Sequence, residues 1–168
     1  MTNFMTRFIF LAFILIFGTI SCSNNTSSSE SDEVEVIKDG HQYDSLLAFQ
    51  YGADDYGMKK YIFAFLKRGP NRDLAKEEAD KLQRAHMDNI NRMAEAGKLV
   101  MAGPFFGDGD LRGIYIFNVA TLEEAEELTN SDPAIQAGSL KMELVEWYGS
   151  AAIVGLTDLH SKIAKKII

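Results

Sequence analysis

Residues 60–66 constrain the fold of this chain most strongly, because nearly all of their side chains are apolar. In a β-strand the odd-numbered side chains from Tyr61 to Phe65 would point to one face, and the even-numbered ones from Ile62 to Leu66 to the other. Residues 113–119 repeat this two-faced pattern. Leaving large apolar side chains in water forfeits roughly 1.5 to 3 kcal/mol each, so we expect a sheet that is covered on both faces.

Glycine, proline and helix-capping residues divide this part of the chain into a regular series of elements. Strands are expected at residues 60–66, 99–102, 113–119 and 140–147. The first helix should have Asp73 as its N-cap and run to about residue 96, where Gly97 ends it in a left-handed conformation. Thr121 and Glu124 form a capping-box pattern for a second helix, which Pro133 should interrupt near its end.

This βαββαβ order is the ferredoxin-like plan, an α+β fold in which an antiparallel sheet carries two helices on one face. Two helices cover only one face of the sheet, whereas the strands at residues 60–66 and 113–119 are apolar on both. We therefore expect a homodimer in which the uncovered faces of two sheets pack against each other. A monomeric mass in solution would contradict this expectation.

One histidine lies within the apolar stripe of the first predicted helix. The stripe has a spacing of three or four residues and consists of Ala79, Leu82, His86, Ile90 and Met93. His86 should therefore point toward the sheet from the middle of a packing surface. It is either a buried histidine that donates to a backbone carbonyl or a functional group.

Asp132 also has two interpretations. Because Pro133 takes the first helical position and Gly138 comes after the last turn, Asp132 is well placed as the N-cap of a short helix. A carboxylate can instead hold an imidazole, and such a pair transfers protons at neutral pH. The sequence thus makes His86 and Asp132 candidate catalytic residues.

Four segments of the chain together resemble the YciI-like (YCII-related) domain family. They are residues 84–90 (RAHMDNI), 97–105 (GKLVMAGPF), 113–117 (GIYIF) and 131–138 (SDPAIQAG). The resemblance covers about residues 58–148, within a predicted domain at residues 58–150. It implies a dimeric α+β barrel with His86 and Asp132 as an active-site dyad. Relatives of this barrel include an enzyme that dechlorinates a chlorinated hydroxyquinol and muconolactone isomerases.

These observations lead to a mechanistic hypothesis. Asp132 fixes the tautomer of His86, which removes a proton next to a carbonyl or from a phenol, and elimination or isomerisation follows. Gly103, Pro104 and Phe105 are candidate ligand contacts, since a tight turn there would let backbone approach a ligand and Phe105 stack on a ring. The alternatives are a simple turn with a core aromatic residue and, for the whole protein, a small-molecule binding or interaction protein without catalysis.

Residues 1–21 have the layout of a secretory signal, with a short basic start followed by an apolar stretch at residues 8–20. The apolar stretch is shorter than the ~20 residues that a membrane span requires. The segment is similar to a bacterial lipoprotein signal, which implies lipidation of Cys22 and an anchor in the bacterial cell envelope. The alternative is ordinary secretion with a free thiol.

Three further segments complete the predicted organisation. Residues 22–33 are rich in Ser, Asn and acidic side chains and should form a flexible tether. Residues 34–57 form an N-terminal extension to the domain. Residues 151–168 are expected to be helical, with Ile153, Leu156, His160, Ile163 and Ile167 on one stripe, and to pack on the domain rather than on a partner or a membrane surface.

Composition argues against several classes of function. The net charge of −7 and the interleaving of basic with acidic residues argue against nucleic-acid binding. The three histidines are widely spaced and Cys22 is the only cysteine, so no metal site and no disulfide within the chain are expected. The sequence also lacks a phosphate-binding glycine loop and a nucleophile elbow, and no cofactor is expected.

Overall fold

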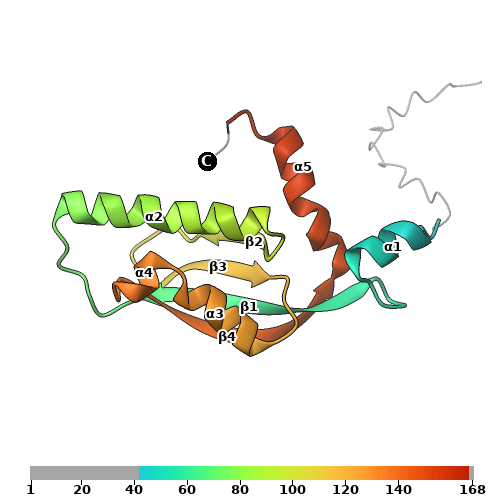
Figure 1. Cartoon of the computed structure of the whole chain (residues 1–168), viewed down its shortest axis with the longest axis horizontal. Coiled ribbons are helices and arrows are strands. Elements are labelled where there is room, and N and C mark those ends of the chain that lie inside the picture. Colours follow the sequence, from blue (N-terminus) through green and yellow to red (C-terminus); the bar gives the residue numbers. More distant parts are fainter. Residues whose placement is uncertain (1–41, 167–168) are drawn as a thin grey trace, which may run out of the picture. The chain divides into compact units, whose positions relative to one another are not determined.

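The computed structural model describes residues 42–166 of the 168-residue chain (Figure 1). The domain consists of β1 (Met58–Arg68), α2 (Lys76–Glu95), β2 (Leu99–Pro104), β3 (Leu111–Phe117), α3 (Leu122–Asn130), α4 (Pro133–Gln136) and β4 (Leu140–Ser150). It is preceded by α1 (Ser45–Tyr51) and followed by the 3₁₀ helix η1 (Ala151–Gly155) and by α5 (Leu156–Ile163). The predicted βαββαβ order and the α+β, ferredoxin-like fold class are confirmed, with α4 as a short addition.

The four strands form one antiparallel sheet in the order β2-β3-β1-β4. The two strands with apolar side chains on both faces, β1 and β3, occupy the centre of this sheet. Ala64 of β1 pairs with Tyr115 of β3 on one side and with Leu144 of β4 on the other. This register places Tyr115 on the same face as the even-numbered side chains of β1.

The helices cover this first face of the sheet (Figure 1). Ile62, Ala64 and Leu66 are buried there with Tyr115 and Phe117. From the helices, Met93 of α2 and Ala125 of α3 are buried in the same cluster. The main core therefore lies between the sheet and the helices, as the ferredoxin-like plan requires.

The chain itself covers part of the second face, which the sequence had suggested only another sheet would cover. Tyr61, Val100 and Ile116 are buried there, and Ile153 and Val154 of η1 pack against them. The rest of this face is more open. Phe63 and Phe65 of β1 are half-buried, and Val145 of β4 is 43% exposed.

Several predicted helix ends are confirmed by the backbone. Gly97 follows α2 with φ +68°, and Gly138 follows α4 with φ +67°. Thr121 caps α3 by accepting a hydrogen bond from the backbone N–H of Glu124. The predicted N-cap of α2 at Asp73 is wrong, because the helix starts at Lys76 with Ala75 at its N-cap, two residues later than predicted. Acidic side chains in the first turn, next to the positive end of the helix dipole, favour this later start.

The predicted turn at residues 102–105 is also wrong. Gly103 and Pro104 belong to β2 and pair with Ile114 and Gly113 of β3. Proline is tolerated because β2 is an edge strand, where a missing backbone N–H removes no ladder hydrogen bond. Phe105 is 42% exposed and is therefore not a core aromatic residue.

The C-terminal segment packs on its own domain through its first part. Ile153 and Leu156 of the predicted stripe are half-buried, whereas His160 and Ile163 of α5 are exposed. Residues 167 and 168 lie outside the described residues. The stripe therefore packs at its start and opens to solvent toward the end of α5.

The predicted signal segment at residues 1–21, the tether at residues 22–33 with Cys22, and residues 34–41 of the extension lie outside the described residues. Between residues 42 and 166, no helix has both the length and the hydropathy that a membrane span requires.

Candidate active site

Three separate elements bring the candidate site together. His86 lies in the middle of α2, Asp132 immediately precedes α4, and Tyr115 lies on the helix-covered face of β3. All three residues are buried, with Asp132 completely inaccessible. The site therefore belongs to the layer between the helices and the sheet.

His86 and Asp132 form a direct hydrogen bond, in which Nδ1 of the ring lies 2.8 Å from Oδ2 of the carboxylate. The other carboxylate oxygen, Oδ1, accepts a hydrogen bond of 2.8 Å from the backbone N–H of Ala134. Asp132 thus caps α4 and contacts His86 at the same time, so the two interpretations of this residue do not exclude each other. The helix cap fixes the carboxylate in the orientation that reaches the imidazole.

The bond to the carboxylate selects one tautomer of His86. A carboxylate only accepts hydrogen bonds, so Nδ1 carries a proton, and in the neutral imidazole Nε2 keeps a free electron pair. Nε2 lies 3.3 Å from the hydroxyl oxygen of Tyr115, which donates to it. The two rings lie nearly parallel at 22°, with centroids 6.3 Å apart.

Tyr115 remains protonated under ordinary conditions. Burial and then the negative charge of Asp132 raise the pKa of its hydroxyl well above the usual value. The hydroxyl is therefore a hydrogen-bond donor to Nε2 rather than a phenolate. The three side chains form a chain of hydrogen bonds from Asp132 through His86 to Tyr115.

A second buried polar group lies one turn after His86 on α2. Asn89 is 4% exposed, and its side-chain oxygen accepts hydrogen bonds from Arg92 and from the hydroxyl of Ser131. Arg92 also donates to Ser131, which directly precedes Asp132. This network connects α2 to the segment that presents Asp132, and it supports the position of the carboxylate.

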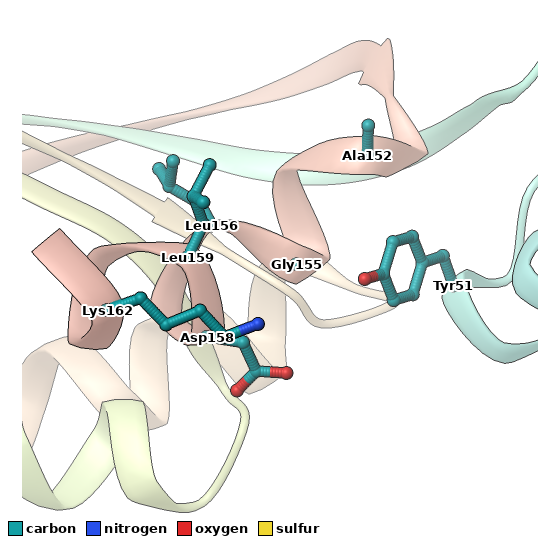
Figure 2. Close-up of a pocket in the computed structure, with 7 residues that line it drawn as sticks. All are labelled: Tyr51, Ala152, Gly155, Leu156, Asp158, Leu159 and Lys162. Atoms are coloured by element: carbon teal, nitrogen blue, oxygen red, sulfur yellow. The ribbon is translucent and has the colours of Figure 1, made fainter.

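Access to the dyad is narrow, because His86 exposes only 10% of its side chain. One pocket of about 370 Å³ lies between Tyr51 of α1 and the C-terminal segment, with Asp158 and Lys162 at its edge (Figure 2). A larger one of about 700 Å³ lies where β1 begins and β3 ends. Neither of these two pockets is lined by His86 or Asp132.

The predicted ligand contacts lie near Tyr115 in the sheet register. Ala102 of β2 is paired with Tyr115, and Gly103 and Pro104 follow at the next two positions. Pro104 therefore lies on the same sheet face as Tyr115, whereas Gly103 lies on the other. Within the described residues, the hydrogen bonds and ring contacts of His86 go to Asp132 and Tyr115 and to none of the three predicted ligand contacts.

Comparison with known proteins identifies the domain. The family model of the YCII-related domain matches residues 62–148, which include all three residues of the hydrogen-bonded series from Asp132 through His86 to Tyr115. The protein belongs to the YCII-related domain family. The uncharacterized protein YjpA of Bacillus subtilis is 32% identical over 62 residues, which cover 37% of this chain and 71% of that protein.

A solved structure is more distantly similar to this YCII-related protein. It is the 5-chloro-2-hydroxyhydroquinone dehydrochlorinase of Burkholderia phenoliruptrix AC1100, in complex with 2,5-dihydroxybenzoquinone. The two chains are 18% identical with a TM-score of 0.38, over 51% of this chain and 90% of that one. At this degree of likeness, the function has to be argued from the site itself.

Sequence reasoning identified two of the residues in this YCII-related site and missed two. The alternation of side chains along β3 placed Tyr115 on the opposite sheet face from its two neighbours in the strand. It did not show which of the two faces the helices cover. Asn89 could have been found, because it lies three residues after His86 and four before Met93 on the buried side of α2. Within residues 42–166, no group of three or more His, Cys, Asp or Glu side chains is placed to hold a metal ion.

Proposed function

We propose that this YCII-related protein is an acid/base enzyme that works without a cofactor and uses His86 and Asp132 as its dyad. The observation that carries the proposal is the 2.8 Å hydrogen bond between Nδ1 and the carboxylate, at a buried position. It leaves Nε2 as the basic atom of the ring. A positioned base of this kind contributes about 10²-fold to 10⁴-fold to a proton-transfer step.

In the proposed reaction, Nε2 of His86 removes a proton from a carbon next to a carbonyl or from a phenolic hydroxyl. The electron pair left on the substrate then expels a leaving group, or a proton returns at another atom of the conjugated system. Asp132 stabilises the imidazolium that forms. These two outcomes are elimination and isomerisation, so the protein would be a lyase or an isomerase.

Tyr115 has a positioning role in this proposal. Its hydroxyl lies 3.3 Å from Nε2, at the long end of hydrogen-bond distances. Such a weak bond orients the ring and can yield to a substrate that reaches Nε2. We propose that the substrate is a small aromatic compound or a lactone, held with the help of Gly103, Pro104 and Phe105.

Proton exchange with solvent tests this proposal even where the product is unknown. The full-length chain is incubated in D₂O with candidate phenolics and lactones, and NMR detects both new products and deuterium bound next to the carbonyl. We expect exchange or product with wild type and neither with His86→Gln. His160→Gln is the matched control, because His160 is exposed on α5. Equal exchange in wild type and His86→Gln would refute the proposal.

A second candidate function is small-molecule binding without catalysis. It is favoured by the narrow access to His86 and by the two pockets that lie elsewhere. The same incubation separates the candidates. A compound that raises the thermal midpoint and gives neither product nor deuterium exchange indicates a binding protein.

We further propose that the protein is a homodimer that is anchored in the bacterial cell envelope. The dimer is supported by the partly open second face of the sheet, with Phe63, Phe65 and Val145 on it. The anchor is supported by the sequence before Cys22 alone. Incorporation of a lipid label into wild type and not into Cys22→Ser would support the anchor, and equal labelling of both would contradict it.

A further inference from the structure

One lysine in the larger pocket has an ammonium group without an anionic partner among the described residues. The pocket lies where β1 begins and β3 ends. Its charged side chains are those of Lys59, Lys60, Lys98, Asp54 and Glu124. Lys60 pairs with Glu146, and Lys98 pairs with Glu124. Asp54 accepts hydrogen bonds from the Tyr148 hydroxyl and from two backbone N–H groups.

Lys59 differs from these paired residues in its contacts. Its ammonium group donates to the neutral side-chain oxygen of Asn118 at 2.7 Å and lies 5.6 Å from the centre of the Tyr61 ring. Its side chain is half-buried, and burial lowers the pKa of the ammonium group. A partly desolvated charge without a counter-ion is unfavourable, and an anion that enters the pocket would relieve that cost.

The size and lining of the pocket indicate the kind of anion. A volume of about 700 Å³ is in the range of small-molecule sites and much larger than an inorganic ion needs. Met58, Val119 and Tyr148 supply apolar surface beside the charged groups. A ligand that matches this lining has one negative group and an apolar body.

We propose that this pocket binds a small organic carboxylate, with the carboxylate on the ammonium group of Lys59 and the apolar body against Met58, Val119 and Tyr148. This site is separate from His86 and Asp132, neither of which lines the pocket. It therefore does not depend on the proposed acid/base function.

Calorimetric titration of the full-length chain with benzoate tests the proposal, with benzamide as the neutral ligand of the same shape. Hydrogen bonds to charged groups are strong enough to favour benzoate by about tenfold or more. Lys59→Gln should remove this preference. Lys141→Gln, a change at an exposed lysine of β4 outside the pocket, should retain it.

A second variant supplies the negative charge from the protein itself. Asn118→Asp places a carboxylate beside the ammonium group of Lys59, so it should also suppress benzoate binding. In wild type, benzoate should raise the pKa of the Lys59 ammonium group, which burial lowers. Binding should therefore take up protons at a pH where this group is partly neutral. Titrations in two buffers of different ionisation enthalpy measure that uptake.

Four outcomes would overturn the proposal. Benzoate and benzamide that bind equally would show that charge does not determine recognition. Failure of both to bind would show that the pocket does not take such a ligand. Undiminished benzoate binding by Lys59→Gln would remove the assigned residue. Inorganic phosphate that binds as tightly as benzoate would contradict the role of the apolar lining.

Discussion

Nδ1 of His86 lies 2.8 Å from Oδ2 of Asp132, although the two residues are 46 positions apart in the chain. α2 directs the imidazole toward the sheet, and the break between α3 and α4 directs the carboxylate toward the imidazole. The cap on α4 and the contact with His86 use different oxygens of the same carboxylate. The sequence signal of a helix cap therefore marks a residue that also belongs to the candidate site.

Tyr115→Phe should separate positioning from proton transfer. The variant removes the donor to Nε2 and leaves that atom without its protein partner, which should lower the free energy of unfolding by about 1 kcal/mol. Turnover should fall less than it does when the charge of Asp132 is removed. Urea unfolding and steady-state rates measure the two effects, and loss of all turnover in a folded variant would assign Tyr115 a direct role.

High pH should destabilise the fold through the buried tyrosines. Burial raises the pKa of Tyr61 to about 12, from a usual value near 10 in the unfolded chain. The folded state then binds the hydroxyl proton of Tyr61 more tightly than the unfolded chain does. The stabilisation from this protonated hydroxyl is complete below pH 10 and is lost as the pH rises toward 12. The free energy of unfolding should fall over this range in wild type and less steeply in Tyr61→Phe. Equal slopes would contradict the prediction.

Gly113→Ala tests the close approach of β2 to β3. A Cβ atom at this position would lie 2.7 Å from the carbonyl oxygen of Gly103. The strands must move apart, and we expect a loss of about 1 to 3 kcal/mol in the free energy of unfolding.

Gly109→Ala is the matched control for this change, because its Cβ would meet nothing within 4 Å. Its effect should stay within about 0.5 kcal/mol. If both variants unfold at the same urea concentration, the close contact between Gly103 and Gly113 has no energetic importance.

In the proposed homodimer, a charge on the open part of the second sheet face should separate the two subunits. Val145→Lys adds this charge at a side chain that is already 43% exposed, so the single subunit should still fold. Light scattering should give twice the chain mass for wild type and the single chain mass for the variant. Leu159→Lys, at a 57% exposed position on α5, should remain dimeric. A wild-type protein with the single chain mass would contradict the dimer.

Elements that are determined by local chemistry could be predicted from the sequence. Gly97 ends α2 because glycine adopts a positive φ readily, and Thr121 starts α3 because its hydroxyl accepts from a free backbone N–H. The stripe on α2 correctly placed His86 toward the sheet. These signals act within one or two helical turns.

Features that depend on distant parts of the chain could not be predicted in this way. The alternation of side chains along β3 does not show whether Tyr115 lies on the sheet face that the helices cover. Gly103 and Pro104 indicate a turn by composition, yet an edge strand accommodates both. The packing of η1 on Tyr61 and Ile116 depends on the path of the chain after β4.

The turnover of Asp132→Asn, compared with its thermal midpoint, tests the proposed dyad most directly. Asparagine caps a helix nearly as well as aspartate. With its one oxygen on the Ala134 N–H, however, its amide nitrogen faces Nδ1 of His86, so the variant neither holds the Nδ1–H tautomer nor carries a charge to stabilise an imidazolium. We predict a folded variant with a midpoint close to that of wild type and turnover lower by about 10²-fold to 10⁴-fold. A folded variant that turns over substrate at the wild-type rate would contradict the dyad and leave Asp132 as a helix cap alone.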